Sequence, residues 1–151
     1  MPAIQTNYPA EMAAAYEGMI ANTEPNNLIS RQVEGAAIGF GKVVKQGTAS
    51  NGVAAATAAA DVVRGITVRD QSVDANSPNL VPVNESALIL QRGVIWVTAG
   101  ESVVAGDPVY MVVGTAQAGR FGKTPTNNLA IPRAIFDSAG GVGALVKVRI
   151  G

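Results

Sequence analysis

The stretch SALILQRGVIWVTAG, residues Ser86–Gly100, carries the strongest β signal in this sequence. Leu88 and Leu90 alternate before a central Arg-Gly pair, and Val94 and Trp96 alternate after it. Alternation of apolar residues with a period of two is typical of a strand that buries one face. A strand through this stretch is therefore the element around which we expect the fold to be built.

Five further segments have the same character and are bounded by turns rich in Gly, Pro and Asn. They are residues 37–47, 62–70, 106–114, 129–137 and 143–151. In the last of them Val146, Val148 and Ile150 alternate with longer or charged side chains, which predicts a half-buried strand. About six or seven short strands between such turns predict a mainly β protein, a compact β-barrel or sandwich.

The composition narrows the possible chemistry. The chain has 151 residues, the size of one domain, and 48% of them are hydrophobic, enough for a buried core. Only 15% are charged, and neither Cys nor His occurs. The commonest general base and the commonest transition-metal ligands are therefore missing, and a disulfide framework is impossible.

The charge is balanced but unevenly spread. Residues 1–30 contain three Glu and no Lys or Arg, whereas residues 31–151 contain eleven basic and eight acidic residues, so the two parts carry −3 and +3. Neither value resembles the basic stripe of a nucleic-acid-binding protein. No stretch is long and apolar enough to span a bilayer, and no secretory leader is evident, so we expect synthesis in a cytoplasm.

The N-terminal part differs from the rest. Pro9 and the following Ala-rich residues up to Tyr16 predict one short helix that ends near Gly18. The next stretch, GMIANTEPNNLISRQVEG at residues 18–35, shows neither alternation nor a helical stripe, and its Pro-Asn-Asn sequence predicts a turn. We therefore expect residues 1–34 to form an extended arm that contacts a partner, and residues 35–151 to form the β body.

Two other segments are expected to be loops. The Ala-rich run at residues 53–60 is compatible with a helix by composition, but its flanking turn residues favour a loop. Residues 71–85 are rich in turn-forming residues and predict a long loop.

The sequence contains no complete motif for catalysis or for cofactor binding. Gly122-Lys123-Thr124 resembles the end of a phosphate-binding loop, but Gln117 stands where that loop requires a Gly, so a hairpin tip is the better interpretation. The eleven carboxylates form no spaced pair. We therefore expect no enzyme, no cofactor and no metal.

An ordered series of segments resembles one known family. The segments are AAAYEGMIANTEPNNLISRQVEGAAIGFGKVV, ADVVRGITVRD, GVIWVTAG, GDPVYMVVG, GRFGKT and the terminal ALVKVRIG. Together they are similar to the structural cement, or capsid decoration, proteins of tailed bacteriophages, over nearly the whole chain. Residues 53–60 and 71–85 contribute little to the likeness.

The resemblance implies a non-enzymatic protein of the virion. It would bind the outer surface of the expanded icosahedral capsid at junctions between capsomers and stabilise the shell against the pressure of the packaged genome. Its partners would be the major capsid protein and further copies of itself, with a trimer favoured over a dimer. An N-terminal arm would reach along the shell beneath a β-barrel body.

On this interpretation the contacts with the capsid or a neighbouring subunit come from the arm, whose apolar residues have no evident place in a strand. The candidates are Tyr8, Tyr16, Met19, Ile20, Pro25, Leu28, Ile29 and Arg31. Two alternatives stay open at this point. One is a phage tail or head–tail joining protein, and the other is a β-module on the virion surface that binds a carbohydrate or a receptor.

Overall fold

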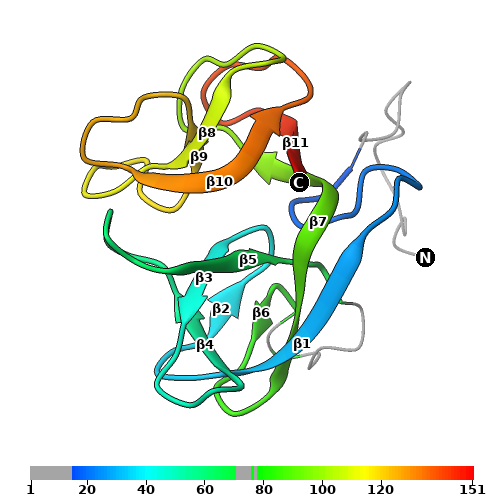
Figure 1. Ribbon diagram of the computed structural model, residues 1–151, viewed down its shortest axis with the longest axis vertical. Helices are drawn as coiled ribbons and strands as arrows, with labels where there is room; N and C mark the ends of the chain where they lie inside the picture. Colours follow the sequence, from blue (N-terminus) through cyan, green and yellow to red (C-terminus); the bar gives the residue numbers. More distant parts are fainter. Residues whose placement is uncertain (1–14, 71–75, 77) are drawn as a thin grey trace, which may run out of the picture.

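The computed structural model describes residues 15–70, 76 and 78–151, and every regular element in this part of the chain is a β-strand (Figure 1). The strands are β1 Asn27–Val33, β2 Ile38–Gly39, β3 Val43–Gln46, β4 Gly52–Ala55, β5 Val63–Thr67, β6 Leu80–Val81, β7 Ser86–Thr98, β8 Pro108–Met111, β9 Phe121–Gly122, β10 Leu129–Phe136 and β11 Leu145–Ile150. The expectation of a mainly β barrel is confirmed. No helix capable of crossing a bilayer occurs among these described residues.

Five strands close into a barrel, which forms the lower unit in Figure 1. Their order is β1-β4-β3-β5-β7, and β7 pairs again with β1 to complete the ring. The β1–β4 pairing is parallel and the others are antiparallel. A small sheet of β2 and β6 contributes Ile38 and Val81 to the core of this barrel. Closure leaves none of the five strands as a free sheet edge.

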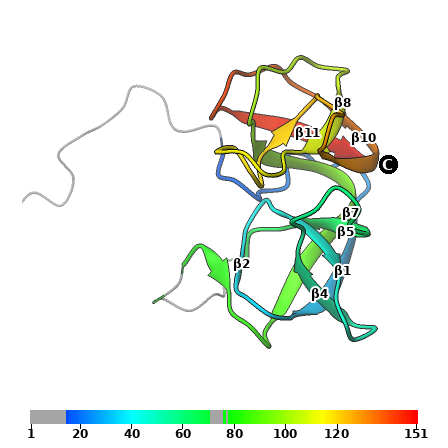
Figure 2. The ribbon, with the colours of Figure 1, turned by 90° about the vertical axis from the view of Figure 1, so that its left-hand side faces the viewer.

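A second unit grows from the other half of β7. Here β11 pairs with β7, and β10, β8 and β9 follow in order. A parallel bridge between Ala99 and Phe121 brings β9 back toward the end of β7. Figures 1 and 2 show the two units one above the other, joined through β7, which at 13 residues is the longest strand.

Strand β7 supplies side chains to two cores. Its residues Ala87 and Ile89 belong to the smaller cluster inside the barrel, while Ile95 and Val97 belong to the larger cluster, which fills the second unit and extends to Val43 and Ile66 of the barrel. Between these pairs lies Gly93, whose φ of +129° is rarely adopted by other residues. The Arg-Gly pair seen in the sequence thus marks the point where one strand passes from one unit to the next.

The segment at residues 27–33 is a strand, and the expectation that it lies outside any strand is wrong. It forms β1, which pairs with β7 from Asn27 to Gln32. Leu28 packs against the larger cluster and Ile29 against the smaller one. Two successive residues on opposite faces of the strand are therefore both apolar. A strand covered on both sides does not alternate, and the sequence therefore lacked the expected pattern.

Three other boundaries differ from expectation. The Ala-rich run, expected to be a loop, begins with strand β4, in which Val53 is fully buried. The loop expected at residues 71–85 contains the short strand β6 in its described part. The strand expected at residues 37–47 is split into β2 and β3, because Gly41 turns the chain with a φ of +66°. Most of the predicted N-terminal helix lies outside the described residues.

A glycine on β5 permits that strand to lie against β7. Gly65 has a φ of +143°, and a Cβ built on it would lie 2.4 Å from the carbonyl oxygen of Leu90. No real Cβ approaches a backbone oxygen so closely, and the backbone on both sides is fixed by the barrel pairing. Only glycine fits here.

We predict that Gly65→Ala lowers the free energy of unfolding by roughly 2–4 kcal/mol, because it combines a backbone clash with a disfavoured φ. Urea unfolding followed by Trp96 fluorescence measures the change. Gly141→Ala is the matched control, since nothing lies within 4 Å of its built Cβ, and it should change the stability by less than about 0.5 kcal/mol. Equal stability of the two variants would contradict this view of the β5–β7 contact.

Candidate functional site

Residues 15–21, here called the entry segment, lie antiparallel to the second half of β7. The amide of Gly18 donates to the Trp96 carbonyl at 2.8 Å, the Trp96 amide donates to the Met19 carbonyl at 2.9 Å, and the Ala21 amide donates to the Val94 carbonyl at 2.8 Å. These bonds continue the pairing of β1 along the same edge of β7. The entry segment is thus part of the fold rather than a free tail.

Gly18 is where the entry segment touches the barrel. Its φ is +86°, and a Cβ at this position would lie 2.8 Å from both the Gly41 nitrogen and the Phe40 Cβ. Its carbonyl accepts a hydrogen bond from the Arg69 amide at 2.7 Å. The glycine predicted as the end of a helix is instead required for close contact between two backbones.

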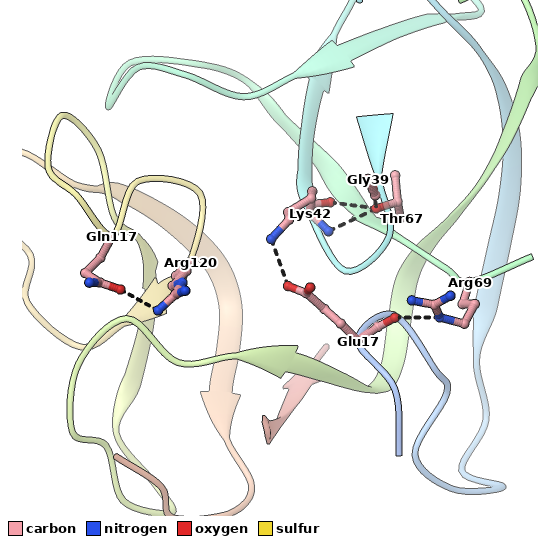
Figure 3. Close-up of polar contacts among 7 residues, drawn as sticks. All are labelled: Glu17, Gly39, Lys42, Thr67, Arg69, Gln117 and Arg120. Atoms are coloured by element: carbon pink, nitrogen blue, oxygen red, sulfur yellow. Dashed lines mark hydrogen bonds and ion pairs between the residues drawn. The ribbon is translucent and has the colours of Figure 1, made fainter. Parts of the chain in front are cut away.

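Side chains fasten the same segment to the barrel (Figure 3). The Glu17 carboxylate forms an ion pair with Lys42 at 2.8 Å, and the Arg69 Nε donates to the Glu17 carbonyl at 3.0 Å. The Arg69 guanidinium also lies 5.0 Å from the ring centre of Phe40 and 5.7 Å from that of Tyr16. The buried Thr67 hydroxyl donates to the Gly39 carbonyl at 2.7 Å and holds the turn that carries Lys42.

Two large side chains of the entry segment remain accessible. Tyr16 is 64% exposed and Met19 is 37% exposed. Ile20, by contrast, packs against the larger core cluster and forms a bridge with Ile95. The accessible pair lies in the segment that directly follows residues 1–14.

The other candidates have separate positions. Pro25 is exposed in the turn before β1, and Leu28 and Ile29 are half-buried between the two cores. Arg31 donates from Nη1 to the Ser30 carbonyl at 2.9 Å, and its buried Nε has no hydrogen-bond partner. Tyr8 lies outside the described residues. The structure therefore brings Tyr16 and Met19 together, whereas Ile20, Leu28 and Ile29 are used within the chain's own core.

The family is shown by comparison with known proteins. A family model described as structural cement protein (E217 gp24/Pam3 gp6) matches residues 4–151. The chain belongs to this family. The match covers both units of the fold and begins eleven residues before the entry segment, at residue 4.

A solved structure supports the fold of this cement-family protein. The chain is similar to a protein in the structure described as the capsid of Myoviridae Phage XM1, with a TM-score of 0.75 and 19% identity. The likeness covers 99% of this chain and 98% of the other. No curated protein sequence matches.

The described acidic residues of this cement-family protein do not gather into a metal site. Three of them clamp turns instead. Glu34 accepts from the amides of Thr48 and Ala49, Asp61 accepts from those of Thr57 and Ala58, and Glu101 accepts from those of Lys123 and Thr124. The segment that resembled a phosphate-binding loop is thus a turn whose amides are bound by a carboxylate of the chain itself.

These hydrogen bonds change the acidity of the three groups. The amides of Ala49 and Thr48 lower the pKa of Glu34. Burial raises the pKa of Asp61 and of Glu101, but amide hydrogen bonds outweigh it, so both pKa values lie below their ordinary values. A lowered pKa in the folded state contributes stability above the ordinary pKa, and this contribution is lost as the pH falls through the folded pKa.

We predict that Glu101→Gln lowers the free energy of unfolding at pH 7 by about 1–2 kcal/mol, since hydrogen bonds to a charged acceptor are replaced by weaker ones. The difference from the unaltered protein should shrink as the pH falls below 4.5, the ordinary pKa of this group. Urea unfolding between pH 3 and pH 7 measures it.

Glu85→Gln is the matched control. Glu85 is exposed and its side chain makes no described hydrogen bond, so its loss should leave the pH dependence unchanged. A difference for Glu101→Gln that stayed constant down to pH 3 would show that the charge of this carboxylate does not hold the turn.

Proposed function

We propose that this protein is a capsid cement that binds the outer surface of the icosahedral shell of a tailed phage at junctions between capsomers. The observation that carries the proposal is the family match over residues 4–151. The similarity of fold to a protein of a phage capsid structure agrees with it. The role is structural: the protein catalyses nothing and needs no cofactor.

Binding across a junction stabilises a shell by a simple mechanism. Genome pressure pulls neighbouring capsomers apart, and a protein bound to both must be detached before they separate. A homo-oligomer, for which we favour a trimer over a dimer, engages several sites at once, so each further contact forms at a high effective concentration. The major capsid protein is the proposed partner, and the protein is made in the cytoplasm of the bacterial host before it joins the virion.

The structure changes which residues are proposed to reach the shell. Because β1 belongs to the barrel and the entry segment is paired with β7, we place the partner-binding arm at residues 1–14, including Tyr8. The accessible Tyr16 and Met19 extend the same surface onto the body. We therefore propose a partner-binding arm shorter than the one expected from the sequence at residues 1–34.

We predict that protein lacking residues 1–14 stays folded but no longer co-sediments with expanded heads that lack the protein, whereas the full chain sediments saturably. Removal of residues 1–30 is unsuitable, because it deletes part of β1 and the whole entry segment. Tyr16→Ala in the full chain should weaken sedimentation by about tenfold, since exposed aromatic anchors dominate many interfaces.

Val62→Ala is the matched control for Tyr16→Ala, because Val62 is 68% exposed but lies outside the proposed arm and entry segment. It should bind as the unaltered protein does. If the truncated protein bound fully, the body alone would carry the affinity and the arm assignment would be wrong. If even the full chain stayed in solution, the cement proposal would fail.

A further inference from the structure

A pocket of about 340 Å³ lies where the two units meet. Its walls come from β5 and β7 of the barrel, from β10 and β11 of the second unit, and from the first residue of β1. This is the region where the neighbour of β7 changes from β5 to β11. The side chains of Val63, Ile131 and Ile150 give it apolar walls.

Three arginines line this pocket, and they share an unusual property. Arg64, Arg92 and Arg133 come from β5, β7 and β10, and none of their side chains makes a hydrogen bond or ion pair with a described residue. The sequence contains seven arginines. The other four, Arg31, Arg69, Arg120 and Arg149, each donate at least one side-chain hydrogen bond. The arginines left without a partner are therefore those that meet at the pocket.

One of the three arginines has a buried side-chain donor. The Nε of Arg64 is buried without a hydrogen-bond partner. A buried donor in this condition is rare in folded proteins, because it has lost its water and gained nothing in return. Among the described residues that line the pocket none is acidic, so the positive charge is not balanced locally.

The backbone at Arg133 is also strained. Its φ is +56°, in the left-handed region, and it follows Pro132 at the irregular part of β10. A non-glycine residue in this region needs a stabilising cause, and such outliers gather at binding sites. The residue with this strained backbone is the third arginine of the pocket lining.

We propose that this pocket binds a side-chain carboxylate from an acidic loop of the shell protein. The proposal rests on the cement function and deepens it. Arginine presents two parallel N–H groups that match the two oxygens of a carboxylate, and the bond is stronger where water is displaced. The apolar walls would contact the methylene groups of an incoming Glu or Asp.

A protein carboxylate fits better than a nucleic-acid phosphate. A phosphate backbone is bound along a basic stripe, but here three arginines converge on one pocket in a chain of zero net charge. The position between the units also suits a clamp, because an inserted loop would contact strands of both units at once. A carboxylate so held would resist the separation of the shell from the body.

The first test examines the pocket without the shell. The full-length protein, labelled with ¹⁵N, is titrated with glutarate at constant ionic strength, and the arginine Nε–Hε signals are followed by NMR. A saturable shift of the Arg64 signal, absent with chloride and absent from Arg149, would support a carboxylate site. Phosphate is titrated in parallel, and a stronger effect of phosphate than of glutarate would overturn the assignment to a carboxylate.

The second test uses the shell. Arg92→Gln with Arg133→Gln should weaken co-sedimentation with expanded heads by about tenfold or more, because the variant loses charge-assisted hydrogen bonds to the carboxylate. Both arginines are exposed, so the double variant should still fold. Arg92→Lys with Arg133→Lys keeps the positive charge but loses the paired N–H groups of the guanidinium, and this variant should also bind weakly. Lys123→Gln with Lys147→Gln removes equal charge outside the pocket and should bind normally.

The remaining outcomes separate the two proposals. Normal binding by the pocket variant would overturn the inference while leaving the cement function intact. A change of its oligomeric state in sedimentation velocity would mean that a second copy, and not the shell, supplies the carboxylate. If the unaltered protein itself fails to bind heads, the cement proposal is wrong and the shell protein does not supply the carboxylate. The glutarate titration alone then decides whether the pocket binds a carboxylate.

Discussion

Backbone hydrogen bonding along both edges of β7 is the constraint on which the rest of this structure depends. One edge is occupied by β1 and the entry segment, and the other by β5 and then β11. A strand paired on both sides has its amide and carbonyl groups satisfied away from water, which is a condition for burying it. Each unit includes part of β7 in its sheet, so the sheet of neither unit is complete without β7.

This arrangement explains where unusual residues occur. Glycines with positive φ stand at Gly65 and Gly93, where β5 approaches β7 and where β7 passes between units. The arginine pocket lies at the same place, because two sheets that share one strand must diverge beside it. The pocket proposed for a partner thus lies beside these glycines, and a ligand there would contact paired strands of both units.

Much of the β structure could be predicted from local pattern, and the failures have a common cause. Strand β11 could be predicted because Val146, Val148 and Ile150 alternate toward a core, and β5 and β7 could be predicted from their apolar and β-branched residues, although neither alternates throughout. Strand β1 was missed because Leu28 and Ile29 serve two different cores, and β4 was missed because alanine carries no strand signal. Of the candidate contacts, Tyr16, Met19 and Pro25 are accessible, whereas Leu28, Ile29 and Arg31 were chosen because the strand that contains them, β1, was not foreseen. The pocket could not be foreseen, since its arginines are separated by 28 and 41 positions, from Arg64 to Arg92 and from Arg92 to Arg133, and only the pairing of strands brings them together.

As a structural cement, this protein is expected to stabilise a filled shell. The most direct measurement heats DNA-filled heads that lack the protein, with and without the purified chain added, and records the temperature at which packaged DNA becomes accessible to a dye. We predict a rise in this temperature that saturates at a fixed number of copies per capsomer, because a ligand that binds only the intact shell shifts the equilibrium toward the intact shell. An unchanged temperature at saturating protein would contradict it.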